Sequence, residues 1–234
     1  MQRLVRYTLI FTIVFAAFTI SPAFLNKQFV AYPLMKNGDW IDLFTPLVLI
    51  PLYWLLFQVN REDTPSQSEV TAFLVLAALW VEGQGMHLGA NAIGHLINDV
   101  AGSDIAELAH FLDEVLSHYL WHIGLVGLSA LLIYRQWNHP FVNERSQFGL
   151  VIVAGIIHGF NYFIIIIEAA TIYLGVPFAV FVVVFTLVWG RRKLRQQPIL
   201  GFFFVTYLVA ILLFFGWGLY WGGLPEFSKV GIIE

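Results

Sequence analysis

The sequence contains no cysteine, and charged residues make up only 12% of its 234 positions. Without cysteine the chain forms no disulfide, and any metal site must use nitrogen and oxygen ligands in place of thiolate. Soluble domains carry about 25% charged residues, so the low value argues against that class. The net charge of −3 gives no basic excess of the kind that nucleic-acid-binding proteins show. We therefore expect no nucleic-acid partner.

Apolar residues fill the chain instead: 59% are hydrophobic, 17% are aromatic, and the mean hydropathy is +0.77. A helix needs about 20 apolar residues to cross a bilayer. Seven stretches have roughly that length: 5–25, 40–59, 68–97, 106–134, 147–170, 173–190 and 198–221. The sequence predicts an all-α, polytopic membrane protein. Its seven-transmembrane-helix bundle forms a single domain over residues 1–234, with a polar site on the helices that span about 68–170.

Basic residues predict the orientation, because they concentrate in cytoplasmic loops. A cytoplasmic N-terminus and an outside C-terminus place nine basic residues inside: Arg3, Arg6, Arg61, Arg135, Arg145, Arg191, Arg192, Lys193 and Arg195. Three then lie outside: Lys27, Lys36 and Lys229. The first stretch lacks a clear A-x-A cleavage site, so we expect a retained helix. The location is a plasma or inner membrane, crossed several times.

Connectors and glycines give local expectations. Thr64 is a plausible N-cap with Gln67 as its capping-box partner, and Ser103 is expected to cap the fourth helix. Gly85 and Gly89 form a small-xxx-small spacing, which predicts a close approach between helices; the alternative is that their missing side chains leave room for a substrate or a planar cofactor beside the histidines.

Polar side chains recur at helical spacing in three of the stretches. Residues three or four positions apart share a helix face. The rows are His87, Asn91 and His95; His110, Glu114, His118 and His122; and His158, Asn161 and Glu168. An ionisable side chain at bilayer depth costs roughly 2.5–3.5 kcal/mol. We therefore expect these rows to face one another, a metal ion or a water-filled cavity.

Three histidines fall at one depth. Counted from the expected outer helix ends, His87, His118 and His158 lie about 11 or 12 residues inward, within one turn of one another at a rise of about 1.5 Å per residue. Three imidazoles and a water are a common catalytic arrangement for zinc. The sequence thus predicts a divalent metal site, zinc before iron, in the outer half of the bilayer. The competing interpretation is interhelical hydrogen bonding.

Further residues receive roles around that site. Glu114 is a metal ligand or a general base, and Asp113 orients a histidine or faces a polar loop. Asn91 or Asn161 would polarise a substrate carbonyl. The remaining candidates for a second metal or for support of the first are His95, His110, His122 and Glu168. For His122 we favour a buried, hydrogen-bonded histidine, and for the other three a wet vestibule.

Missing motifs narrow the chemistry. No lysine or arginine lies in the polar rows, although phosphoryl transfer usually recruits such cations. There is no GxSxG motif and no serine or cysteine nucleophile beside an evident base. The sequence therefore favours a zinc hydrolase that attacks a membrane-soluble amide or ester, an apolar or neutral lipid-like substrate, from the outer half of the bilayer.

Seven spans with histidines and acids at membrane depth resemble, in architecture, the seven-helix zinc hydrolases that include alkaline ceramidases and adiponectin-type receptors. Those proteins carry a paired HxxxH in the last helix, whereas here the pair is His118 and His122 in the fourth stretch. No site residue is carried over from them.

Two other functions fit the same residues. Histidines with Glu114 and Glu168 suit a di-iron oxidoreductase, and paired histidines suit haem, with a lipid or quinone-like substrate. Titratable rows also suit a proton or metal-ion transporter. However, the inner halves of these helices are almost purely apolar, which argues against a continuous path for ions across the membrane.

Overall fold

The computed structural model describes residues 2–30, 32–58, 64–96, 102–141, 148–194 and 196–232. Helices account for almost all of its regular structure, as the sequence predicts. They are α1 (Gln2–Ile20), α2 (Asn37–Gln58), α3 (Gln67–Leu96), α4 (Asp104–His110), α5 (Ser117–Asn138), α6 (Phe148–Glu168), α7 (Ile172–Phe185) and α8 (Pro198–Trp221). A 3-10 helix, η1 (Ser21–Phe24), follows α1, and two π-helical segments, η3 (Phe111–Leu116) and η4 (Thr186–Gly190), continue α4 and α7.

Six helical segments in the described part of the chain are long and apolar enough to cross a membrane. They are Gln2–Phe24, Asn37–Gln58, Asp104–Asn138, Phe148–Glu168, Ile172–Gly190 and Pro198–Trp221. The continuous segment from α4 through α5 matches the expected fourth stretch. The chain is thus a multi-pass membrane protein. The longest helix, α3, has 30 residues but does not reach the apolarity of these six.

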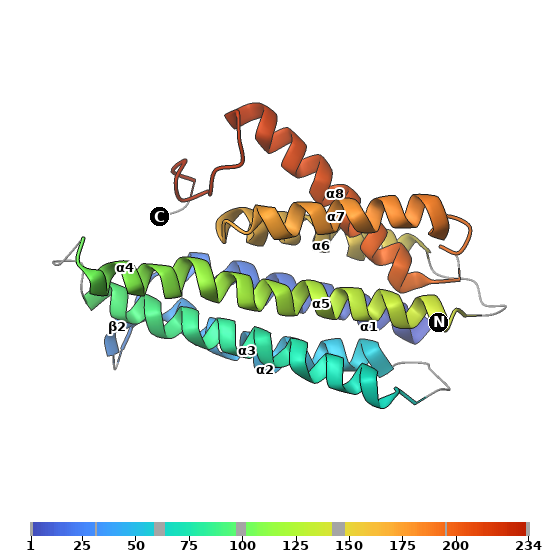
Figure 1. Ribbon diagram of the computed structural model, residues 1–234, viewed down its shortest axis with the longest axis horizontal. Helices are drawn as coiled ribbons and strands as arrows, with labels where there is room; N and C mark the ends of the chain where they lie inside the picture. The colour runs from blue at the N-terminus through green and yellow to red at the C-terminus, as the bar shows by residue number, and fades with distance from the viewer. Residues whose placement is uncertain are drawn as a thin grey trace.

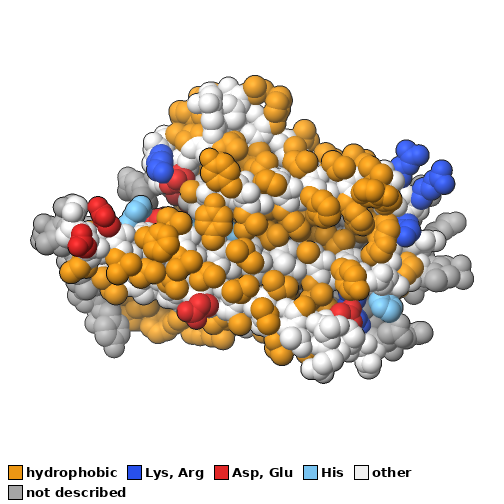
Figure 2. Space-filling view, in the orientation of Figure 1, with side chains coloured by type: hydrophobic (Ala, Val, Ile, Leu, Met, Phe, Trp, Pro, Cys, Tyr) orange, Lys and Arg blue, Asp and Glu red, His pale blue; other side chains and the backbone are white. Residues whose placement is uncertain are grey.

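Successive long helices run in alternating directions, and the two termini lie at opposite ends of the bundle (Figure 1). In that view α3 lies along α5, while α8 crosses the others obliquely. Hydrophobic side chains cover most of the visible face, and lysine and arginine side chains gather mainly at the end that holds the N-terminus (Figure 2). Such an apolar exterior is what a lipid-facing surface requires.

A small hairpin between α1 and α2 was not expected from the sequence. Strand β1 (Gln28–Phe29) pairs antiparallel with β2 (Tyr32–Lys36). At its end, Asp39 accepts a hydrogen bond from the backbone N–H of Lys36, with an N···O distance of 2.8 Å. This contact joins the hairpin to the first turn of α2.

The expected cap of α3 is wrong by two residues. Ser66 and Glu69 form the capping box: the backbone N–H of Ser66 donates to Oε2 of Glu69 at 2.8 Å, and the N–H of Glu69 donates to Oγ of Ser66 at 3.3 Å. At the start of α4 the expectation is confirmed, because Oγ of Ser103 accepts from the N–H of Ala106.

Close helix packing also uses glycines other than those expected. A Cβ at Gly83 would lie 2.5 Å from the backbone N of Trp121, and one at Gly124 would lie 2.6 Å from the carbonyl oxygen of Leu76. These glycines let α3 and α5 approach backbone to backbone. Gly85 and Gly89 have open space where a Cβ would stand, so their predicted role in helix contact is wrong.

Candidate functional site

Five titratable residues gather where α3 meets the junction of η3 and α5. We call His87, Asp113, Glu114, His118 and His122 the histidine–acid cluster. Nδ1 of His87 lies 2.7 Å from Oδ1 of Asp113, which joins α3 to η3. The distance suits a charge-assisted hydrogen bond, although the ring does not aim its N–H directly at the oxygen.

His118 and Glu114 lie beside the pair formed by His87 and Asp113. The ring centroids of His87 and His118 are 5.0 Å apart. Nδ1 of His118 lies 3.9 Å from Oε2 of Glu114, one turn earlier. His118 is buried, whereas the Glu114 side chain is 44% exposed. The cluster therefore extends from a solvent-accessible carboxylate to a buried imidazole.

The π-helical segment η3 supplies both carboxylates. Its wide turn is closed by the N–H of Ser117, which donates to the carbonyl oxygen of Leu112, five residues back. Oγ of Ser117 also donates to the carbonyl oxygen of Asp113. A π turn changes the angular phase of Asp113 and Glu114 relative to the following α-helix, and such turns are frequent at functional sites. Residue spacing alone does not reveal this change of phase.

His122 forms the deep end of the cluster. Its ring centroid lies 6.5 Å from that of His118, and its Nδ1 lies 2.7 Å from Oγ1 of Thr171. Thr171 belongs to the turn between α6 and α7, in which Ala170 has a φ of +51°. This left-handed residue belongs to the C-terminal cap of α6, in which the N–H of Thr171 donates to the carbonyl oxygen of Ile166 and the N–H of Ala170 to that of Ile167. The favoured interpretation of His122, a buried and hydrogen-bonded histidine, agrees with its contact to Thr171.

Several polar atoms of the cluster are buried without an aligned hydrogen-bond partner among the described residues. They are Nδ1 of His87, Oδ1 of Asp113, Nδ1 of His118 and Nε2 of His122. Native proteins leave few buried polar atoms in this state, and each one calls for an explanation such as a catalytic role, a water or an ion. Six further buried polar atoms among the described residues are in the same state, so the cluster is distinguished by the closeness of its titratable groups to one another.

The structure does not place His158 with the other two histidines of the predicted zinc site. Its ring lies among Phe11 and Phe15 of α1 and Phe202 of α8, with centroid distances of 5.5, 4.7 and 5.2 Å. The expectation failed because depth fixes the height of a residue but not the direction it faces. Helix α6 turns this face toward α1 and α8, whereas His87 and His118 meet between α3 and α5.

Two other α6 residues also have partners outside the cluster. Oδ1 of Asn161 accepts a hydrogen bond from Oγ1 of Thr19 in α1, at 2.9 Å. Oε2 of Glu168 accepts from the backbone N–H of Phe227 at 2.9 Å, which holds the C-terminal segment against α6. Their expected roles, in carbonyl polarisation and in a second metal or vestibule, are not supported by these contacts.

Three predicted residues remain, on α3 and at the end of α4. Asn91 is half-buried on α3, one turn beyond His87. His110 is exposed at the end of α4, close enough to Glu114 for an electrostatic interaction. The side chain of His95 lies outside the described residues.

Asp42 on α2 is a neighbour of the cluster that the sequence analysis missed. It interacts electrostatically with His87. The available signal was a second aspartate, three residues after Asp39 and near the start of the apolar stretch 40–59.

Metal binding by three ligands is not supported by the side-chain positions. Within the described ranges, no group of three or more histidine, aspartate or glutamate side chains is arranged so that it could hold a metal ion. The arrangement is instead suited to proton transfer, since two carboxylates and three imidazoles form an almost continuous series.

Comparison with known proteins adds no assignment. No family model matches the chain, and no curated protein or solved structure matches it either.

Proposed function

We propose that the protein is a membrane enzyme that uses the histidine–acid cluster for acid–base chemistry on a neutral, membrane-soluble substrate. The observation that carries the proposal is the contact of 2.7 Å between His87 and Asp113, beside a second imidazole at 5.0 Å. A carboxylate at Nδ1 selects the tautomer that leaves Nε2 as a proton acceptor. His87 is therefore the general base, and Asp113 orients it.

The proposal includes seven spans, with the N-terminus in the cytoplasm and the C-terminus outside, in a plasma or inner membrane. Helix α3 would be the seventh span, since its 30 residues reach about 45 Å at a rise of about 1.5 Å per residue. Arg191, Arg192 and Lys193 follow α7 at the bundle end that also holds the N-terminus (Figure 1). By the positive-inside tendency that end is cytoplasmic, which places the histidine–acid cluster in the outer half.

Hydrolysis of an amide or ester is the reaction that we expect. Nε2 of His87 takes a proton from water as the water oxygen bonds to the substrate carbonyl carbon. The carbon–nitrogen or carbon–oxygen bond then breaks, and the leaving atom receives the proton from the imidazolium. Asn91 would donate a hydrogen bond to the carbonyl oxygen, and Glu114 would exchange protons with outside water.

Metal-assisted hydrolysis is a second candidate, favoured by one observation. Nδ1 of His87, Oδ1 of Asp113 and Nδ1 of His118 are buried donor atoms without aligned partners, and a cation would satisfy all three. The ligands would then be His87, Asp113 and His118, with Glu114 as a fourth, and His158 would take no part. In their present positions these side chains do not form a metal-holding group among the described residues, so they would have to move to surround an ion.

The test is hydrolysis of long-chain chromogenic amides and esters by the purified protein in lipid nanodiscs. Asp113→Asn should lower kcat/KM by about 10²- to 10⁴-fold, the usual contribution of acid–base catalysis. The matched control is Glu107→Gln, which removes an exposed acid of α4 and should leave the rate unchanged. No hydrolysis of any substrate by the wild type, or equal activity in Asp113→Asn, would overturn the proposal.

Elemental analysis separates the two candidates. Activity that persists after complete chelation supports metal-free acid–base chemistry. One bound zinc per chain that is lost in His118→Ala, together with activity, supports metal assistance. Visible absorbance of the purified protein would instead indicate iron or haem and would contradict both.

A further inference from the structure

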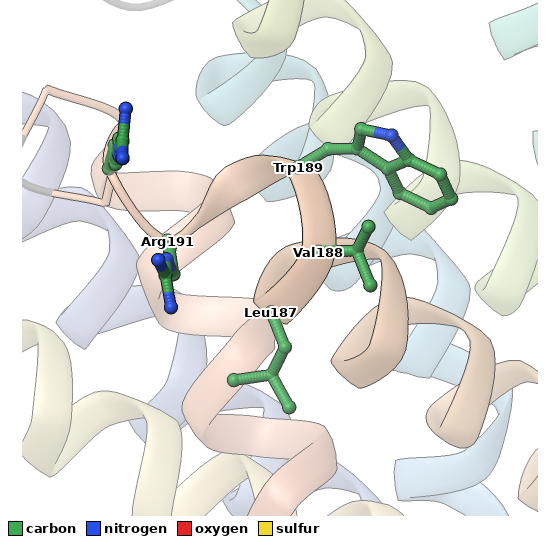
Figure 3. A pocket seen from close by; sticks show the side chains of 5 residues that line it. Leu187, Val188, Trp189 and Arg191 are labelled. Carbon is green, nitrogen blue, oxygen red and sulfur yellow. The ribbon is translucent and has the colours of Figure 1, made fainter.

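A surface cavity of about 500 Å³ lies at the opposite end of the bundle from the histidine–acid cluster. Leu187, Val188, Trp189, Arg191 and Arg192 line it. Figure 3 shows the four labelled side chains projecting around the turn where η4 ends α7. Ligand pockets typically have volumes of about 300–1,000 Å³, so the cavity is large enough for a small molecule or a lipid headgroup.

The polar part of the cavity consists of two arginines that have no acidic partner. In the described portion of the chain, neither Arg191 nor Arg192 forms an ion pair. Lys193 is held elsewhere, because its Nζ lies 3.6 Å from the ring centroid of Trp137. Two consecutive arginines without a counter-charge attract an anion, and the planar guanidinium group suits the oxygens of a phosphate.

The apolar part of the cavity lies on the membrane-spanning side of these arginines. Leu187, Val188 and Trp189 are all exposed, and they belong to the segment Ile172–Gly190, which is apolar enough to cross a membrane. Tryptophan is enriched at membrane–water interfaces. Along the helix axis, the cavity therefore changes from an apolar wall to a cationic end over about one turn. This is the order of groups in a phospholipid.

We propose that this cavity binds an anionic phospholipid of the cytoplasmic leaflet. Arg191 and Arg192 hold the headgroup phosphate, and the first part of an acyl chain lies along Leu187, Val188 and Trp189. A net negative lipid is preferred over a zwitterionic one, because a choline or ethanolamine group would find no carboxylate within the described lining. The binding site is independent of the chemistry proposed for the histidine–acid cluster.

The test measures lipid binding to the purified protein by native mass spectrometry in a neutral detergent. The probes are phosphatidylglycerol, phosphatidylcholine and inorganic phosphate. The wild type should bind phosphatidylglycerol more tightly than phosphatidylcholine, and the double variant Arg191→Gln/Arg192→Gln should lose about tenfold or more of that affinity, since each basic residue contributes to attraction of anionic lipid.

A matched control removes the same charge elsewhere. Lys27→Gln/Lys36→Gln neutralises two exposed lysines near the hairpin, at the other end of the bundle, and should keep wild-type affinity. Equal losses in both double variants would mean that net charge alone attracts the lipid and would overturn the proposal. Competition by millimolar inorganic phosphate would show a phosphate site that does not need the acyl chain, and would overturn the assignment to a lipid.

Discussion

Two acid–base pairs join α3 to the segment that runs from η3 into α5, one near each end of their contact. Asp113 lies 2.7 Å from His87 at one end, the outer end in the orientation proposed above, and Oε2 of Glu69 accepts from Nη1 of Arg135 at 2.8 Å at the other, the inner end. The separations are almost the same, but the surroundings differ. The side chains of the inner pair are 1% and 12% exposed, and those of His87 and Asp113 are 24% and 14% exposed.

Both members of the inner pair, Arg135 and Glu69, form further hydrogen bonds besides the one that joins them. Nε of Arg135 donates to the carbonyl oxygen of Phe57, and its guanidinium carbon lies 4.8 Å from the Phe57 ring centroid. Glu69 also closes the capping box with Ser66. The outer pair has no such network, and its facing atoms have no aligned partners. A fully hydrogen-bonded buried network stabilises the fold, whereas the less completely bonded pair keeps its titratable groups available for proton transfer.

The largest effect on stability should come from the inner pair. Arg135→Met leaves the Glu69 carboxylate without its cation, and removal of one partner from a buried pair costs about 3–5 kcal/mol. Asp113→Asn should change the free energy of unfolding far less, because its pair is more exposed and incompletely bonded. Thermal unfolding of both variants in detergent measures the difference.

Adding Glu69→Gln to Arg135→Met should recover part of the lost stability, since no uncompensated charge then remains. If Asp113→Asn were the more destabilising of the two single variants, the distinction between a structural and a functional pair would be wrong.

A smaller loss of stability should follow from forcing α3 and α5 apart at the close contact that lies between the two pairs. Gly83→Ala places a methyl group where the backbone of Trp121 stands 2.5 Å away, and overpacking of this kind costs about 1–3 kcal/mol. The matched variant Gly85→Ala adds the same methyl group into open space and should be neutral, or stabilising by up to about 1 kcal/mol. Unfolding curves that coincide for the two variants would contradict the close approach of α3 and α5.

The helices of this chain could be predicted from its sequence, but the directions their faces point could not. All seven apolar stretches correspond to helical segments, within a few residues at their ends. Apolar runs and short polar connectors are sufficient for that inference. A lipid-facing side chain and a core side chain are both hydrophobic, however, so the pattern that reveals the buried face of a soluble helix is nearly absent.

For the candidate site, too, the sequence identified most of the residues but not the direction in which each one points. The helical rows led to His87, His118 and the adjoining acids, and the structure brings these together. The same rows led to His158, which instead faces α1 and α8. Neither the π turn at η3 nor the proximity of Asp42 to His87 has a spacing signature, because both depend on tertiary packing. The same limit applies to Arg135, whose partner Glu69 is 66 residues away in the sequence.

The capping box offers a finer test of the inner pair. Ser66→Ala removes the hydroxyl that bonds both the N–H and the carboxylate of Glu69, and loss of an N-cap usually costs about 1 kcal/mol. Thr64→Ala, at the cap position that the sequence predicted, should have no effect, because the helix begins at Gln67. The same unfolding assay applies. A loss in Thr64→Ala that equals the loss in Ser66→Ala would show that the helix begins earlier.

The smallest effect on activity should come from the histidine outside both pairs. His158 is buried, yet its neighbours are aromatic rings and its Nδ1 has no partner among the described residues. An apolar group of similar volume forfeits no hydrogen bond there, so His158→Leu should change stability by no more than about 1.5 kcal/mol. Hydrolytic activity and metal content should also remain, because no contact connects this ring to His87 or His118. A metal that is present in the wild type and absent from a well-folded His158→Leu would restore the three-histidine site and would show that α6 turns toward α5 when the ion binds.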